Sequence, residues 1–349
     1  MKFLKNIILL LLLLFVIGAV YLATLDGNYD VAKTRLIKAD PIVVFNDLND
    51  YKNWMDWGPW YEKDSTIRVQ YENKTIGEGG AYAWTSDIEG GGRMKTLKVQ
   101  KPERLDQEIV FETPFGDMTS DVYWILNKTE TGTELTWGIK GELPFFSRFM
   151  ASDMTEQLGP MEERGLELFD ENLQKKLKVY TIDSVGVVDF SGGFYLYVST
   201  SSKINSVSVK AKEMMAHIDK FVVENNIRQT GSPFTLYHKF DQENGSAMFS
   251  VAYPIAERII TQDSDILTGY MERGTYFKTI LKGAYNNSKE AWEKAMFDAE
   301  NLKDYSLEEN GEPFEIFVNN PENTPNPTQL VTEIYVPVEL KGYNDLTIH

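Results

Sequence analysis

The chain has 349 residues, a length that suggests two folded domains rather than one. Hydrophobic residues make up 42 % of it and charged residues 25 %, a globular composition that excludes a disordered or fibrous chain. The 52 acidic residues against 35 basic ones leave a net charge of −17, so phosphates would be repelled and no nucleic-acid partner is expected. The chain contains no cysteine, which excludes disulfides, thiolate metal sites and a cysteine nucleophile.

The N-terminal segment, residues 1–25, has the pattern of a membrane anchor. Lys2 and Lys5 precede an unbroken apolar run at residues 7–23, and Asp26 follows it. Such a run can span a bilayer as one helix, and the positive-inside rule places its N-terminus in the cytoplasm. We therefore expect a bacterial membrane protein with its folded domains on the extracytoplasmic (periplasmic) side. A cleaved secretory signal is the alternative, although no pair of small residues is well placed for cleavage.

The first domain is predicted at residues 28–176 and combines strands with two helices. Polar and apolar residues alternate over residues 28–38, which predicts a strand. Asp40-Pro41 then begins a helix, with Asp40 as its capping residue and Pro41 at its first position. After a turn at Gly159-Pro160, apolar residues at helical spacing predict a final helix over residues 161–176. Glycine-rich and charged turns separate the strands predicted between the helices, at residues 67–71, 80–86, 94–99, 106–111, 119–128 and 133–141.

This order of elements resembles a known superfamily. Together with the phrases GEGGAYAW and SDVYWILNKTETGTELTWGIKGELPFF, it resembles the START-like (SRPBCC, polyketide-cyclase-like) superfamily. The resemblance implies a helix-grip fold, in which a curved sheet wraps the last helix and can enclose a lipid-like ligand. Large aromatic side chains could line such a cavity or fill an ordinary core. Both interpretations stay open for Trp54, Trp57, Trp60, Trp84, Trp124 and Trp137.

The second domain, residues 177–349, contains an internal repeat with halves at about 177–256 and 265–340. PFTLY at residues 233–237 and PFEIF at 313–317 stand eighty residues apart, each after an amphipathic helix and before a strand that ends at a proline. Each half is predicted as strand, helix, strand, strand, so the whole chain is α+β. Two such halves should pair around a pseudo-two-fold axis and leave a cleft between them. The helices are expected at 207–226 and 288–304, and the later strands at 249–255 and 332–338.

Glu315 breaks the symmetry of the repeat, because the first half has Thr235 in its place. Period-2 geometry puts Glu315 on one sheet face with Phe317, and Tyr335 on the next strand is expected to join them. A carboxylate among rings can bind a lipophilic cation or act as a general acid. The alternative is a glutamate on a solvated strand face. The ring-bearing residues predicted to bind ligand with Glu315 are Phe317, Tyr335, Tyr285, Tyr276, Tyr237 and Trp292.

The phrases GSPFTLYHKFD, EPFEIFVNNPENTP and LVTEIYVPVE give this domain a resemblance of its own. They resemble the effector-binding domain shared by the gyrase-inhibitory-protein-like (GyrI-like) family and multidrug-sensing transcription activators. The resemblance implies that Glu315 is the central acidic residue of a drug pocket, with Tyr335, Tyr285 and, less securely, Tyr237 beside it. Some members are hydrolases that open strained cyclopropane rings with the same glutamate and a tyrosine. No DNA-reading helix-turn-helix domain accompanies it here, so direct gene regulation is not expected.

These observations leave three hypotheses about function. The favoured one is a membrane-anchored protein that binds hydrophobic, aromatic or cationic small molecules without binding nucleic acid. The alternative is a hydrolase of reactive or strained-ring aromatic compounds with Glu315 as general acid or base. In the third, both domains are interaction scaffolds with filled cores. No cofactor or metal is expected, because the only histidines are His217, His238 and His349, and the first two are interpreted as structural.

Overall fold

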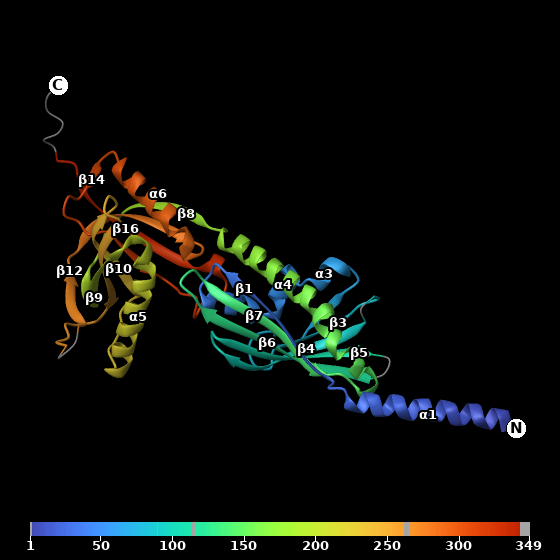
Figure 1. The fold of residues 1–349 in the computed structure, drawn as a ribbon. Coiled ribbons are helices and arrows are strands. Elements are labelled where there is room, and N and C mark those ends of the chain that lie inside the picture. Colours follow the sequence, from blue (N-terminus) through green and yellow to red (C-terminus); the bar gives the residue numbers. More distant parts are fainter. Residues whose placement is uncertain (1, 89, 114–115, 262–264, 343–349) are drawn as a thin grey trace. The chain divides into compact units, whose positions relative to one another are not determined.

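A computed structural model describes residues 2–88, 90–113, 116–261 and 265–342, so His349 lies outside the described residues. The chain divides into two compact units, with the boundary between Lys175 and Lys176 (Figure 1). Each unit is built on its own antiparallel sheet.

The chain begins with the apolar helix α1 (Lys2–Thr24). The stretch Phe3–Thr24 has a mean hydropathy of 2.9, which makes it long and apolar enough to cross a membrane. None of it is buried against the rest of the protein. A helix with these properties serves either as a membrane anchor or as a signal sequence.

The sheet of the first unit has seven strands in the order β1-β7-β6-β5-β4-β3-β2, and every neighbouring pair is antiparallel. All seven strands lie within a few residues of the ranges predicted from alternation and turns. Their bounds are β1 (Asn28–Ile37), β2 (Arg68–Tyr71), β3 (Ala81–Thr85), β4 (Gly91–Gln100), β5 (Arg104–Thr113), β6 (Gly116–Lys128) and β7 (Thr133–Glu142).

Short helical segments join these strands, and one long helix follows them. The shorter segments are α2 (Pro41–Leu48), η1 (Tyr51–Asp56), α3 (Trp60–Lys63) and η2 (Phe145–Asp153). As predicted, the side chain of Asp40 caps α2 by accepting a hydrogen bond from the backbone N–H of Ile42. The long helix α4 (Met154–Leu177) runs through Pro160, so the break expected at Gly159-Pro160 is wrong. Proline removes only one helical hydrogen bond, and the residue four positions earlier, Glu156, is exposed where water can satisfy its carbonyl.

Aromatic rings fill the space between α4 and the sheet of the first unit. Trp124 and Trp137 stack with ring centroids 4.7 Å apart, and Phe169 of α4 contacts Trp57 at 5.3 Å. Gly165 lets α4 approach closely, because a Cβ at this position would lie 2.4 Å from the Trp137 ring. The packed-core interpretation therefore holds for Trp57, Trp124, Trp137 and Trp54, which are all buried, whereas Trp60 and Trp84 are half-buried.

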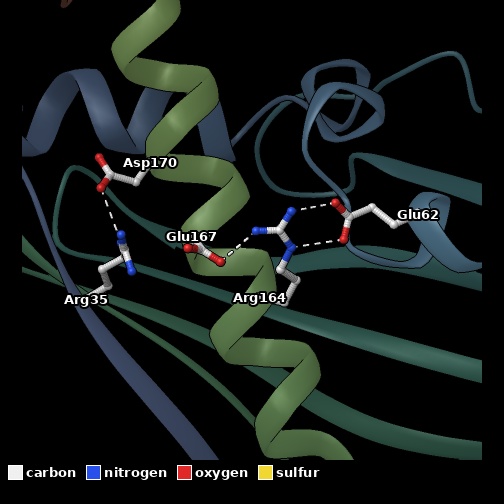
Figure 2. A network of polar contacts seen from close by, with 5 residues as sticks. All are labelled: Arg35, Glu62, Arg164, Glu167 and Asp170. Atoms are coloured by element: carbon white, nitrogen blue, oxygen red, sulfur yellow. Dashed lines mark hydrogen bonds and ion pairs between the residues drawn. The ribbon is translucent and has the colours of Figure 1, made fainter.

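Ion pairs on the outer flanks of α4 connect this helix to its neighbours (Figure 2). The guanidinium of Arg164 makes two hydrogen bonds to Glu62 of α3, of 2.6 and 3.0 Å, and one of 2.6 Å to Glu167. Arg35 of β1 bonds Asp170 at 3.2 Å. Because these groups are partly exposed, each pair adds little stability by itself, and the buried rings beneath α4 supply most of it.

The sheet of the second unit contains both halves of the repeat. Its order is β12-β9-β11-β10-β15-β16-β13-β8, with β14 pairing β16 beside this path. The bounds are β8 (Thr181–Phe190), β9 (Gly193–Lys203), β10 (Phe234–Asp241), β11 (Ser246–Pro254), β12 (Leu267–Met271), β13 (Gly274–Lys282), β14 (Tyr305–Leu307), β15 (Phe314–Phe317) and β16 (Val331–Leu340). The helices are α5 (Val207–Glu224) and α6 (Ser288–Glu300), with the short segments η3 (Ile204–Ser206), η4 (Tyr285–Asn287) and η5 (Pro327–Gln329).

The predicted order of strand, helix, strand, strand occurs as β9-α5-β10-β11 in the first half. It occurs again as β13-α6-β15-β16 in the second half, where the short strand β14 is inserted between α6 and β15. The two halves join edge to edge through β10 and β15, which makes one continuous sheet. The second helix ends at Glu300 rather than at residue 304, and a turn over residues 301–304 leads into β14. Strands β8 and β12, which the repeat pattern does not include, form the two edges.

These edge strands are exchanged between the halves. β8 precedes the first half in the chain but pairs with β13 of the second, whereas β12 precedes the second half and pairs with β9 of the first. Only two residues, Ser191 and Gly192, join β8 to β9, so the ends of the sheet must curl toward each other. Gly192 has φ +68° and abuts β12, since a Cβ there would lie 2.0 Å from the carbonyl oxygen of Met271.

The two faces of this curled sheet have different contents. Helices α5 and α6 cover one face with two apolar clusters, one around Ile218 and Phe249 and one around Ala295 and Ile334. The opposite face is filled by a third cluster that contains Phe234, Tyr276, Phe314 and Tyr335, with Phe190 packed against it. Residues of a strand alternate between these faces, so the strand register decides which side chains can meet.

Candidate functional site

Glu315 lies on β15 near the centre of the sheet, on the face that the helices cover. It stands opposite Thr235 of β10 and Ile334 of β16, and Ile334 belongs to the apolar cluster under α6. Only 6 % of Glu315 is exposed, so the interpretation as a glutamate on a solvated strand face is wrong. A carboxylate in such a place must be hydrogen-bonded, protonated or paired with a cation.

Two neutral groups donate hydrogen bonds to the Glu315 carboxylate. The hydroxyl of Tyr237 donates to Oε1 at 2.8 Å, and the indole Nε1–H of Trp292 donates to Oε2 at 3.1 Å. Within the described part of the chain, no lysine, arginine or histidine forms an ion pair with this carboxylate. Burial therefore raises the pKa of Glu315, and the two hydrogen bonds only partly oppose that shift.

Four aromatic side chains surround the carboxylate on this face. Tyr237 and Trp292 meet edge to face with centroids 5.4 Å apart, and Tyr285 meets Phe317 in the same way at 5.4 Å. The Tyr285 hydroxyl donates to the backbone carbonyl of Asn319 at 2.8 Å. Burial, and then the charge of Glu315, raise the pKa of both tyrosines, which stay protonated and neutral. All four rings are half-buried, so this cluster reaches the surface.

The same face also carries three buried threonine hydroxyls for which the described residues offer no hydrogen-bond partner, those of Thr235, Thr279 and Thr332. One row of facing residues crosses the four neighbouring strands β13, β16, β15 and β10, in the order Thr279, Ile334, Glu315, Thr235. Thr332 stands opposite Phe317. Sequence reasoning missed these threonines as site residues, because only the strand register shows that they share this face with Glu315. Buried hydroxyls without a partner are groups that a polar ligand group or an ordered water could satisfy.

Two predicted partners of Glu315 lie on the opposite face, so the expectation that Tyr335 joins it is wrong. Tyr335 stands opposite Phe314, not Glu315, and stacks on the Phe314 ring at 4.7 Å. Tyr276 contacts Phe314 at 5.1 Å in the same cluster. The hydroxyl of Tyr335 bonds Glu333 at 2.7 Å. The structure thus brings together Glu315, Tyr237, Trp292, Tyr285 and Phe317, and separates Tyr276 and Tyr335 from them.

The histidines of the second unit make polar contacts elsewhere. His238 bonds Glu312 through Nδ1 at 2.7 Å and Ser250 through Nε2 at 2.6 Å. Ser250 is only 1 % exposed, which leaves its hydroxyl no access to a substrate, and this agrees with a structural role. His217 bonds Asp265 on the surface at 2.9 Å. Among the described residues, no group of three or more His, Asp or Glu side chains is placed to hold a metal ion.

A second buried carboxylate lies in the first unit, on the inner side of α4. Glu162 is fully buried, and neither of its oxygens has a hydrogen-bond partner in the described part of the chain. Burial raises its pKa to about 8, while the charge of Lys33 opposes this shift and that of Asp30 adds to it. Such a group keeps its proton at neutral pH.

Comparison with protein families assigns the second unit. Residues 196–339 match the family model described as "GyrI-like small molecule binding domain". The second unit therefore contains a GyrI-like small-molecule binding domain, which includes α5, α6 and every residue of the Glu315 cluster. No curated protein matches the chain.

Several solved structures resemble parts of the chain. The C-terminal domain of EcmrR is 18 % identical, with 47 % of this chain and 99 % of that one covered and a TM-score of 0.40. Protein MLL2253 from Mesorhizobium loti is 18 % identical, with 42 % and 97 % covered and a TM-score of 0.33. A Staphylococcus epidermidis protein is 15 % identical, with 45 % and 96 % covered and a TM-score of 0.33. These TM-scores lie below 0.5, so the likeness carries no inference about function.

Proposed function

We propose that the second unit binds a hydrophobic small molecule that is aromatic, cationic or both, against Glu315. The observation that carries this proposal is a carboxylate, 6 % exposed, whose only hydrogen-bond donors among the described residues are neutral. A ligand cation would supply the missing positive charge, and the rings of Tyr237 and Trp292 offer stacking surfaces for its body. The family match supports small-molecule binding in general.

Proton release should accompany the binding of a cation. Burial raises the pKa of Glu315, whereas a bound cation would lower it again because positive charge favours the carboxylate. Affinity should therefore fall as the pH drops through the raised pKa, and a neutral ligand should show no such dependence. Calorimetry in buffers with different ionisation enthalpies measures the proton released.

We further propose that α1 holds the chain in a membrane with both units on the extracytoplasmic side. Its apolar length and the basic residues Lys2 and Lys5 before it support this orientation. The net charge of −17 argues against a nucleic-acid partner. In the first unit, aromatic rings occupy the space between α4 and the sheet, which argues against the lipid-like ligand that its START-like resemblance implies. Alkaline phosphatase fused after residue 342 should be active in a bacterial host, whereas a fused green fluorescent protein exported in unfolded form should stay dark.

The binding proposal is tested on residues 26–349, because α1 is not buried against the rest of the protein and its removal leaves both cores intact. The probes are tetraphenylphosphonium, a lipophilic aromatic cation, and neutral triphenylphosphine oxide. A ligand at 100 times its Kd should raise the unfolding free energy by about 2.7 kcal/mol. We expect Glu315→Gln to weaken binding of the cation at least about tenfold, which is about 1.4 kcal/mol, and to leave binding of the neutral probe unchanged.

Glu333→Gln is the matched control, because Glu333 lies on the neighbouring strand and bonds Tyr335 on the opposite face. This variant should bind the cation like the wild type. An equal loss of affinity in both variants, or wild-type affinity in Glu315→Gln, would contradict the proposed site. Thermal melting of each variant without ligand shows whether the second unit is still folded.

Hydrolysis of reactive or strained-ring aromatic compounds is a second candidate function. The hydrogen bond from Tyr237 to Glu315 favours it, because a carboxylic acid with a raised pKa beside a tyrosine can act as a general acid. Glu315→Gln would then abolish turnover of such a compound while retaining its binding. Binding without any product in the wild type would exclude hydrolysis and leave the binding function intact.

A further inference from the structure

An exposed apolar patch lies on η2, the segment that follows the last strand of the first unit. Phe146, Phe149 and Met150 are 68, 57 and 37 % exposed, and we call these three side chains the η2 patch. η2 is a 3-10 helix, in which residues three apart lie one above the other, so Phe146 and Phe149 share one side and Met150 follows Phe149 in the next position around the helix. Single exposed apolar residues are common on protein surfaces, but three within five residues of one short helical segment indicate a contact surface.

Strand pairing ties this segment to the point where α1 ends. Asn28, the first residue of β1, pairs with Glu142, the last residue of β7, and η2 starts three residues later. The backbone N–H of Leu143 donates to the carbonyl of Gly27 at 2.9 Å. Gly27 also lies against η2, because a Cβ on it would be 2.9 Å from Cγ of Arg148.

The length of the connection limits how far the patch can lie from a membrane. Only residues 25–27 separate the end of α1 from β1. At about 3.5 Å per residue, Asn28 stays within roughly 14 Å of the last residue of α1. Since η2 starts beside Asn28, the η2 patch stays close to the bilayer surface at any angle between α1 and the sheet.

We propose that Phe146, Phe149 and Met150 insert into the interface of the bilayer that α1 spans, as a second attachment of the first unit. This rests on the proposed anchoring function of α1. Phenylalanine and methionine side chains enter the boundary between headgroups and acyl chains through burial of apolar area. Tyr21 is exposed near the end of α1, at the depth where aromatic residues gather in membrane proteins.

The charges around the patch specify the kind of lipid surface. Arg148, the basic residue of η2, already bonds Glu142 at 2.8 Å, and the chain as a whole is strongly acidic. The attachment therefore depends on apolar burial and not on attraction to anionic headgroups. A zwitterionic phosphatidylcholine bilayer suffices, and the contact should persist at high salt because screening affects only charge interactions.

The experiment uses the full chain in phosphatidylcholine proteoliposomes, and the absence of cysteine allows single labels. An environment-sensitive nitrobenzoxadiazole label is attached to Phe149→Cys, and its quenching is measured with lipids that carry a nitroxide at a shallow or a deep acyl position. Leu13→Cys within α1 reports anchoring, and Leu97→Cys, 48 % exposed on β4, is an apolar control away from α1. We expect shallow quenching at residue 149 at least twice that at residue 97, and deep quenching at residue 13.

The possible outcomes distinguish failure of the proposed insertion of the η2 patch from failure of the proposed anchoring by α1. Quenching at residue 13 with only control-level quenching at residue 149 overturns the η2 attachment and keeps the anchor. No quenching at either residue means that α1 does not span the bilayer, so the anchoring proposal fails. A further variant adds Phe146→Ser and Met150→Ser to the label at residue 149 and should lose at least half of the shallow quenching. Undiminished quenching there would show mere proximity to the bilayer and would also overturn the proposal.

Discussion

Among the residues that the structure describes, each unit buries one glutamate beneath a helix, and the two carboxylates have different surroundings. Glu162, on the inner side of α4, has no hydrogen-bond partner in the described part of the chain. Glu315, under α6, accepts hydrogen bonds from Tyr237 and Trp292. Burial raises the pKa of both, and only at Glu315 do directed donors oppose the shift. Donors aimed at a carboxylate prepare it to ionise, whereas an unpartnered carboxyl is stable only as the neutral acid.

The presence or absence of hydrogen-bond donors distinguishes Glu315, which is suited to a cationic ligand, from Glu162, which is buried without a partner in the described part of the chain. At Glu315 the donors and the half-buried rings let a positive group approach an ionised partner. At Glu162 the nearest contributing charges are Lys33 and Asp30, whose effects on its pKa oppose each other. Four sets of substitutions test this contrast between Glu315 and Glu162.

Replacing both donors, as Tyr237→Phe with Trp292→Phe, should make Glu315 resemble Glu162. Each change leaves a buried carboxylate oxygen without its partner, so we expect a loss of about 3 kcal/mol in the unfolding free energy for the pair. Urea unfolding at neutral pH measures this loss. In a Glu315→Met background the same two changes should cost less, because no carboxylate remains to be left unpaired. Equal losses in both backgrounds would mean that the donors act through packing alone.

Glu162→Gln should stabilise the first unit increasingly as the pH rises. The folded state holds this proton up to about pH 8, whereas the unfolded chain releases it near the ordinary value of 4.5. The folded state thus binds more protons between these values, so wild-type stability falls relative to the variant as the pH rises and levels off above pH 8. We expect a difference on the order of 2 kcal/mol at pH 9 and almost none at pH 4. A difference independent of pH would show that Glu162 does not titrate in this range.

Glu315→Gln should change stability less than Glu162→Gln does, by about 1 kcal/mol or less at pH 9. Removing the charge stabilises the folded state at high pH, but the amide can accept through only one oxygen and loses one of the two hydrogen bonds. The same denaturant series across pH measures this. A pH-dependent gain larger than that of Glu162→Gln would reverse the contrast between the two sites.

The smallest effect is expected from Thr235→Val and Thr332→Val, which remove hydroxyls that lack a partner in the described structure. Valine has nearly the same shape, so each change should stabilise the ligand-free second unit by about 0.5 kcal/mol. Affinity for a ligand that bonds these hydroxyls should fall. A loss of stability instead would indicate that water satisfies the hydroxyls.

Local patterns predicted most of the secondary structure but not how its strands meet. Alternation and turn residues located the strands of the first unit, and the cap at Asp40 located α2. Apolar stripes at helical spacing located both helices of the second unit. The helix through Pro160 was missed because tertiary packing on the rings beneath α4 outweighs one lost hydrogen bond. The edge strands β8 and β12 were missed because their pairing is entirely non-local.

The candidate site was predicted in part for the same reason. Period-2 geometry within β15 correctly placed Glu315 with Phe317, since residues of one strand need no partner to define their face. The face of Tyr335 depends on the register between β15 and β16, and one residue of offset moves it to the other side. The strand registers also place Thr279 and Thr332 on the same face as Glu315, which no pattern within a single strand indicates.

The exchanged edges have a consequence for how the second unit is assembled. Because β8 precedes the first half but pairs with the second, and β12 precedes the second half but pairs with the first, each half without the other lacks an edge strand and has an open edge. Open edges recruit other strands and promote aggregation. Although the sequence contains the same pattern twice, a fragment with only one half should be insoluble. In the whole second unit, the two halves should unfold in a single cooperative step.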